Sequence, residues 1–275
     1  MLQRQVTLII AIAILSSAIA SAATPAKQDA LSQLENLESK TRQLSMDLWD
    51  YSEIALQEER SAALLAGFLE SEGFEIEMGV AGMPTAFVAS WGEGRPRVGI
   101  LAEYDALPGV GNAAVPERSG REDGVTSGQG CGHNLFGAAS TTAAVAMKRT
   151  MEKLGIDGTV VLFGTPAEET VVGKVFMARD GLFDDMDAVL DWHPGVETKT
   201  RNDPGQAMNS FSVEFFGQAA HGAYDPWNGR SALDGVEMLN YGVNMMREHI
   251  EPTARIHYVI PEGGDAPNVV PEYAK

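Results

Sequence analysis

Residues 158–169 read GTVVLFGTPAEE, an apolar run that ends in a turn and two adjacent acids. A continuous apolar run of this kind is typical of a strand that is buried on both faces of a parallel sheet. Similar runs lie at 97–109 (RVGILAEYDALPG) and 186–195 (MDAVLDWHPG), and helix-favouring segments at 137–154 and 172–183 separate the three. Because strands and helices alternate, we predict an α/β protein with a mainly parallel, covered sheet.

The segments before this core predict helices and a hairpin. Apolar residues recur at helical spacing between 29 and 71. FEIEMG (74–79) and TAFVASWG (85–92) alternate between apolar and polar residues, as an edge strand and its hairpin partner do. The hairpin is therefore expected to extend the sheet at one edge.

A second, smaller α+β domain is expected after Pro204. SFSVEFFG (210–217) and ARIHYVI (254–260) predict strands, and 231–250 predicts an amphipathic helix between them. The apolar face of this helix would consist of Leu233, Val236, Leu239, Val243 and Met246.

The first residues predict export. MLQRQ carries one positive charge, an apolar stretch follows, and Ala20-Ser21-Ala22 fits the small-residue rule for signal peptidase cleavage. The alternative is an uncleaved anchor, but the apolar stretch is short for a membrane span. We expect a soluble periplasmic or secreted protein with three parts: a signal peptide (1–22), the N-terminal part of a catalytic domain (23–205) and a partial second domain (206–275).

Charge and cysteine content exclude several classes of protein. The formal net charge is −18, so no basic surface is expected for nucleic acid or for anionic membranes. Cys131 is the only cysteine, which rules out an internal disulfide. Stability must then come from a packed core, for which 275 residues are enough.

Side chains with metal-ligand chemistry follow the ends of the three expected strands. In an open parallel sheet the carboxyl ends of the strands meet at one edge, where ligands bind. Thiolate, imidazole and carboxylate are the ligands expected for zinc or a related divalent ion. The residues are Glu103 and Asp105 after the first run, Glu168 and Glu169 after the second, His193 after the third, and Cys131 and His133 in the glycine-rich loop GQGCGHNLFG (128–137).

Each signal alone also has an ordinary structural interpretation. Cys131 could be a buried unligated thiol, the two acids a solvated loop, and His193 a satisfied core residue. Buried together without a cation, however, Glu168 and Glu169 would repel each other. One of them can bind an ion while the other faces a water as general base. Cys131 and His133, one residue apart, are expected to point the same way from an extended backbone.

The chain resembles a known family at these positions. The motifs LAEYDALPG, GCGHNLFG, GTPAEE, DWHPG, GQAAHGA, GRSALD and APNVVP occur in the order of the aminoacylase and carboxypeptidase (peptidase M-twenty) superfamily of dinuclear metal amidohydrolases. The nearest branch is that of the aminobenzoyl-glutamate hydrolases. The resemblance implies a phosphorylase/hydrolase-like catalytic domain and an inserted α+β, ferredoxin-like lid and dimerisation domain, present here in part.

The resemblance also implies a metal centre. It implies two divalent ions, zinc or manganese, with Cys131, His133, Glu169 and His193 as ligands. Glu168 would be the general base that activates a bridging water. Glu103 stands where many relatives carry a metal-binding histidine, and it is not among the implied ligands.

Four more residues match positions with a role in the family. Asp105 resembles the acid that orients the metal ligands. His221 resembles the lid-domain histidine that reaches the active site of the partner subunit and steadies the oxyanion. Asn268 and Arg230 resemble groups that recognise the substrate or shape the lid, and Arg230 could equally be structural.

Two features depart from the common pattern. Asn134 and Phe136 replace an aspartate and a second histidine of the related indole-acetyl and hippurate hydrolases, which favours the aminobenzoyl-glutamate branch. Relatives also carry a final metal-binding histidine near their C-terminus, which these residues do not supply. We expect a fragment, a truncated product, or a chain that another polypeptide completes.

The leading hypothesis is a metal-dependent amidohydrolase that cleaves N-acyl amino acids, with aminobenzoyl-glutamate as the favoured type of substrate. A homodimer or a partner subunit is implied by the resemblance. One alternative is a non-catalytic remnant that binds metal or ligand without turnover. Another is a cysteine hydrolase that uses Cys131 with His133, for which two residues so close in a tight loop have poor geometry.

Overall fold

The computed structural model describes residues 24–200, 205 and 207–275, and the expected signal peptide lies outside them. Contacts divide the chain into two compact units, one that ends at Thr198 and one that begins at Lys199. The expected domain boundary, between residues 205 and 206, lies a few residues further along the chain. Within the described residues, no helix combines the length and the apolar character that a membrane crossing needs.

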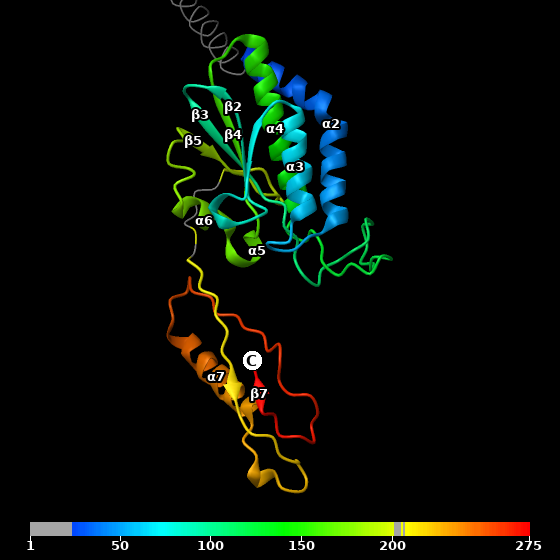
Figure 1. The fold of residues 1–275 in the computed structure, drawn as a ribbon, viewed down its shortest axis with the longest axis vertical. Helices are drawn as coiled ribbons and strands as arrows, with labels where there is room; N and C mark the ends of the chain where they lie inside the picture. Colours follow the sequence, from blue (N-terminus) through cyan, green and yellow to red (C-terminus); the bar gives the residue numbers. More distant parts are fainter. Residues whose placement is uncertain (1–23, 201–204, 206) are drawn as a thin grey trace, which may run out of the picture. The chain divides into compact units, whose positions relative to one another are not determined.

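The first unit is built on a five-stranded sheet (Figure 1). β3 pairs in parallel with β4 and with β5, as the three apolar runs predict. β1 and β2 form the expected hairpin, and β2 continues antiparallel along β4, so the sheet is mixed rather than mainly parallel. In spatial order the strands are β1 (Glu75–Met78), β2 (Phe87–Glu93), β4 (Gly158–Gly164), β3 (Arg97–Ala102) and β5 (Ala188–Leu190).

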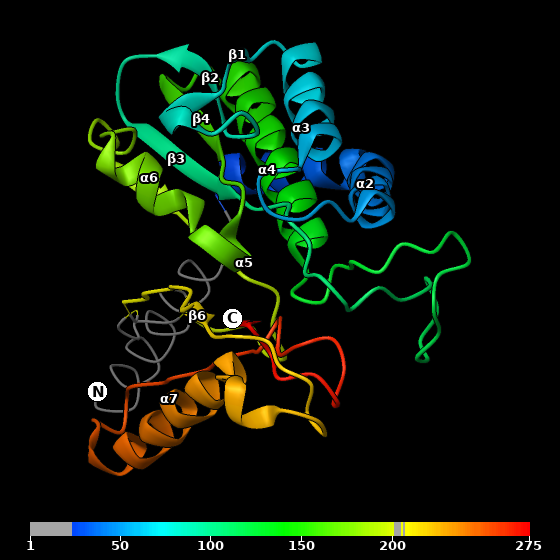
Figure 2. The same ribbon diagram turned by 60° about the horizontal axis from the view of Figure 1, so that its bottom comes forward.

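Helices cover both faces of this sheet (Figures 1 and 2). The helical pattern between 29 and 71 forms two helices, because Ser52 adopts a left-handed backbone (φ 43) and ends the first of them. Three helices lie over one face: α2 (Pro25–Tyr51), α3 (Glu59–Ser71) and α4 (His133–Leu154). The other face carries α6 (Gly173–Arg179); α5 (Glu168–Val171) is a single turn that follows β4, and η1 (Val80–Gly82) follows β1.

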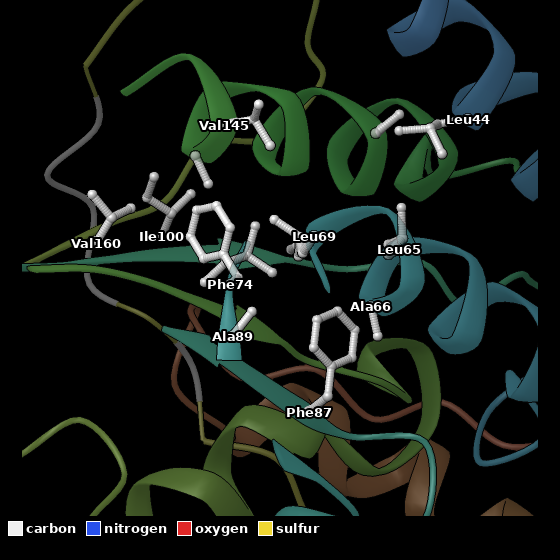
Figure 3. Close-up of a cluster of buried hydrophobic side chains, with 14 of the residues drawn as sticks. Leu44, Leu65, Ala66, Leu69, Phe74, Phe87, Ala89, Ile100, Val145 and Val160 are labelled. Atoms are coloured by element: carbon white, nitrogen blue, oxygen red, sulfur yellow. The ribbon is translucent and has the colours of Figure 1, made fainter. Parts of the chain in front are cut away.

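β4 is the centre of the sheet, and all its residues are buried. Val160 and Leu162 pack into the core beneath α2, α3 and α4. Figure 3 shows Val160 in this core with Leu44, Leu65 and Val145 of the three helices. Val161 and Phe163 pack on the opposite face with Met177 of α6. Because successive side chains of a strand point to opposite faces, the unbroken apolar run serves both cores.

The second unit contains one long helix and a small sheet. The helix, α7 (Ala232–Met246), is capped by the Ser231 hydroxyl, and β6 (Phe215–Phe216) pairs antiparallel with β7 (Tyr273–Ala274). Short turns η2 (Pro226–Asn228) and η3 (Arg247–His249) flank the helix. The amphipathic prediction holds in part, since Val236 is buried while Leu239 and Met246 are exposed.

The prediction of a strand over 254–260 is wrong. These residues form no strand in the structure, and Tyr258, Val259 and Ile260 are exposed. A strand needs a neighbour for its backbone N–H and C=O groups, and here β6 pairs with β7 instead. The ferredoxin-like arrangement of this unit stays a prediction.

Candidate metal centre

His133 is the hub of a polar cluster beyond the carboxyl ends of the parallel strands. It is the first residue of α4 and is fully buried. Its Nδ1 lies 2.9 Å from Asp105 Oδ1, and its Nε2 lies 2.9 Å from Glu103 Oε2 and 4.0 Å from Glu168 Oε2. The long loop 103–132 and α5 lie at the same end of the unit (Figures 1 and 2). The strand-end residues thus meet, as the sequence predicts.

Asp105 contacts both this histidine and the backbone of the α5 turn. Its Oδ1 accepts from His133 Nδ1, and its Oδ2 accepts from the backbone N–H of Glu169 at 2.9 Å. Burial lowers the pKa of His133, but the hydrogen bond and charge of Asp105, with the charges of Glu169 and Glu168, outweigh burial and hold that pKa above its usual 6.5. With the proton on Nδ1, the lone pair of Nε2 points at carboxylate oxygens.

Three buried polar atoms of the cluster lack hydrogen-bond partners in the described part of the chain, and a bound cation would supply the missing interactions. His133 Nε2, Glu103 Oε2 and Glu169 Oε1 have no hydrogen-bond partner among the described residues. The first two lie 2.9 Å apart, but their geometry makes no hydrogen bond. Buried polar atoms nearly always have a partner, and an imidazole nitrogen beside carboxylate oxygens is a donor set for a divalent ion.

Two groups of donor atoms share His133. Cys131, His133 and His193 form one group, and Glu103, His133 and Glu168 form the other; within each group the ligand atoms lie within 4.8 Å of one another. Cys131 Sγ is 3.3 Å from His193 Nε2. Since only one nitrogen of His133 is free of Asp105, His133 can coordinate a single ion.

The backbone between Cys131 and His133 corrects one expectation. It is a turn rather than extended chain, and Gly132 has a left-handed φ of 83. A Cβ on Gly132 would lie 3.1 Å from Pro194 Cγ, in the segment that carries His193. Glycine therefore suits the left-handed turn, and a Cβ at this position would crowd Pro194.

Glu168 and Glu169 begin the single-turn helix α5. They follow Ala167, a fully buried residue whose φ is 58, in the left-handed region. Burial raises the pKa of Glu168 above its ordinary value; Glu169 and Asp105 add to the rise, and His133 opposes it. A carboxyl with a raised pKa is a better proton acceptor, as a general base requires.

Cys131 is a poor nucleophile without a cation. Burial, with the nearby charges of Glu169, Glu168 and Asp105, raises the pKa of its thiol to about 12. This environment argues against the cysteine-hydrolase hypothesis, and the histidine within contact of the sulfur is His193 rather than His133. A bound metal ion would deprotonate the thiol outright.

Alkylation of Cys131 by iodoacetamide at pH 8 is expected to be slow in metal-free protein. A thiol with a pKa of about 12 is almost wholly protonated there, and the higher nucleophilicity of its thiolate recovers only part of the loss. We expect a rate at least roughly 10-fold below that of the same protein unfolded in urea. Equal rates for the folded and unfolded protein, followed by mass spectrometry, would contradict this environment.

Sequence reasoning missed two charged residues that contact the cluster. Lys174 of α6 forms an ion pair with Glu103, and burial lowers the pKa of that lysine. Glu58, at the start of α3, is fully buried and accepts from the backbone N–H of Ala167 at 2.9 Å. Neither has a sequence signal of its own, because Lys174 lies in an ordinary helical pattern and Glu58 in a pair of acids before a helix.

The remaining predicted residues belong to the second unit. His221 and Asn268 are neighbours there: Gly222 N donates to Asn268 O at 2.9 Å, and His221 pairs with Val269 in an isolated bridge. Arg230 is exposed, and its backbone exchanges hydrogen bonds with Gln218.

The sequence and the fold of this chain are similar to those of known proteins. Residues 99–267 match the model of "Peptidase family M20/M25/M40". The chain is 44% identical over 229 residues to one of the subunits of the p-aminobenzoyl-glutamate hydrolase of Escherichia coli, covering 83% of this chain and 48% of the relative. It is 31% identical over 261 residues to the Xaa-Arg dipeptidase of Mus musculus, covering 90% and 56%. The YXEP protein of Bacillus subtilis, a dinuclear metal binding peptidase, has a similar structure with TM-score 0.51 and 21% identity, covering 87% of this chain and 63% of that one.

A covered α/β sheet thus carries thiol, imidazole and carboxylate donors beyond its parallel strands, a set of ligands that suits a divalent metal ion. The chain belongs to peptidase family M20/M25/M40, as its matched residues and its 44% identity to a curated relative show. It spans about half the length of the curated relatives it matches.

Proposed function

We propose that this protein hydrolyses the amide bond of N-acyl amino acids, with aminobenzoyl-glutamate as the preferred type of substrate. The observation that carries the proposal is the buried nitrogen His133 Nε2, which faces Glu103 and Glu168 without a hydrogen bond. We propose Cys131, His133, Glu169 and His193 as ligands of two divalent ions, zinc or manganese. The dinuclear centre of the similar Bacillus subtilis protein supports the number of ions.

Each residue of the cluster has its own role in the proposed hydrolysis. A divalent ion bound there would lower the pKa of water and polarise the amide carbonyl. Glu168 takes the proton of the attacking water and delivers it to the leaving amine. Asp105 keeps the proton of His133 on Nδ1, and its bond to the N–H of Glu169 fixes α5 against the histidine. The position of Glu168, whose Oε2 lies 4.0 Å from His133 Nε2, supports its role in this hydrolysis.

The tautomer of His221 supports a role in stabilising the oxyanion. Its Nδ1 accepts from the backbone N–H groups of Ala223 and Tyr224, at 3.2 and 3.1 Å. The proton of the neutral ring is then on Nε2, and this side chain is exposed. A fixed N–H donor is what a developing oxyanion needs. We propose that His221 supplies it, and that Arg230 and Asn268 contact the substrate.

We also propose a partner subunit and a location for this protein. The Escherichia coli relative is one subunit of a hydrolase, which supports a partner subunit or a homodimer for this chain. The signal-like residues 1–22 support export to the periplasm or beyond the cell. No nucleic acid or membrane partner is proposed, given the net charge of −18.

Release of aminobenzoate from aminobenzoyl-glutamate is the test. Protein stripped with a chelator is expected to be inactive, and addition of zinc or manganese is expected to restore turnover, because the donor set fits such an ion. Benzoylated amino acids other than glutamate are the control for the substrate class. Stoichiometric metal binding without turnover on any of them would contradict the proposal and support a non-catalytic metal-binding protein.

A further inference from the structure

Ala167 is a strained residue at the start of the α5 turn. Its φ is 58 and its ψ is 34, in the left-handed region that an alanine rarely adopts. Glu168 and Glu169 follow directly, so the direction of both carboxylates depends on this one backbone conformation. Strain of this kind persists only where surrounding contacts hold it.

Glu58 supplies such a contact. Its side chain is fully buried, Oε1 accepts from Ala167 N at 2.9 Å, and Oε2 accepts from the Thr85 hydroxyl at 3.0 Å. The backbone carbonyl of Thr85 accepts from the buried Tyr104 hydroxyl at 2.6 Å. Tyr104 lies between Glu103 and Asp105 in the sequence, so the same contacts run from the start of α3 to both sides of the cluster.

We propose that Glu58 is a positioning residue, whose buried carboxylate holds Ala167 in its left-handed conformation and so aims Glu168 and Glu169 at the metal centre. The inference rests on the proposed function for its kinetic consequences only. The backbone conformation itself can be tested without turnover.

Glu58→Met removes the acceptor and keeps the bulk of the side chain. We expect a fall of about 10- to 100-fold in kcat and in zinc affinity, with KM nearly unchanged, as is usual when a residue behind a metal ligand is lost. Glu58→Gln should stay within a few-fold of wild type, because its amide oxygen still accepts from Ala167 and the Thr85 hydroxyl can accept instead of donate. Rates are expressed per folded molecule.

Ala167→Gly tests whether the backbone conformation at residue 167 causes the loss, because glycine adopts the left-handed conformation without steric cost. In the Glu58→Met background this second change should restore most of the lost kcat and zinc affinity. The control is Glu53→Met, at the same end of α3, whose carboxylate bonds Arg60 N, Ser61 N and Ser61 Oγ and no residue of the α5 turn. It should lower stability but leave kcat and zinc affinity unchanged.

Hydrogen exchange at the amide of Ala167 tests the contact with Glu58 separately from its effect on catalysis. We expect protection in wild type and in Glu58→Gln, and loss of protection in Glu58→Met. Wild-type kcat and zinc affinity in Glu58→Met, or failure of Ala167→Gly to restore them, would overturn the positioning role. If wild type neither binds zinc nor turns over, the proposed function fails, and an amide of Ala167 that stays protected in Glu58→Met then overturns the inference as well.

Discussion

Replacement of Glu168 by glutamine is expected to reduce kcat by roughly 10²- to 10⁴-fold, the usual contribution of general acid–base catalysis. The amide has nearly the same shape as the carboxylate but cannot take a proton from water. Glu168 lies at the first turn of α5, 4.0 Å from His133 Nε2, and is partly exposed, so that water can reach it. The measurement is kcat for aminobenzoyl-glutamate at saturating metal.

Metal content shows whether this loss is chemical. If Glu168 is the base and Glu169 the ligand, Glu168→Gln should bind the same number of zinc ions as wild type, whereas Glu169→Gln should bind fewer. Glu152→Gln is the matched control and should retain full activity, because Glu152 lies on the exposed side of α4 and pairs with Lys148. An unchanged kcat in Glu168→Gln would show that another group takes the proton.

Replacement of Lys174 by methionine is expected to destabilise the first unit by about 3 kcal/mol, the low end for loss of one partner of a buried ion pair. Glu103 is almost fully buried, so losing Lys174 removes the ammonium that is paired with its carboxylate. We take the low end because the lysine side chain is 24% exposed. Urea denaturation of metal-free protein measures the change in the free energy of unfolding.

A double variant tests the assignment of this loss to Glu103. Glu103→Gln with Lys174→Met removes both charges, and it should recover most of the stability because the carboxylate that lost its partner is no longer charged. Arg179→Met, at the end of the same helix, breaks the exposed pair with Asp180 and should change the free energy of unfolding by less than about 0.5 kcal/mol. Equal denaturation midpoints for wild type and Lys174→Met would show that the ion pair does not stabilise the unit.

The three parallel strands and the convergence of their polar ends could be predicted because both depend on local pattern. A short β-branched apolar run such as TVVLF favours the centre of a covered sheet, and parallel strands bring their carboxyl ends to one edge. The mixed sheet could be predicted only in part. The hairpin has a sequence pattern, but nothing local to β2 specifies that it pairs with β4 instead of β3.

The failures share a physical cause, which is long-range packing. Residues 254–260 alternate like a strand, yet a strand forms only where a neighbouring backbone is available. The pair Cys131 and His133 was expected on extended chain, but the start of α4 and the approach of Pro194 impose a turn at Gly132. The sequence spacing of two ligands does not determine the backbone between them.

By itself, then, the sequence determined which side chains could bind a metal and at which edge of the sheet they would meet, because residue type and strand pattern are local properties. Only the tertiary structure decided which of them are buried and how they are held. Lys174 reaches Glu103 from a helix 71 positions further along the chain, and Glu58 reaches Ala167 across 109 positions. The cost of burying their charges depends on surroundings that only folding assembles.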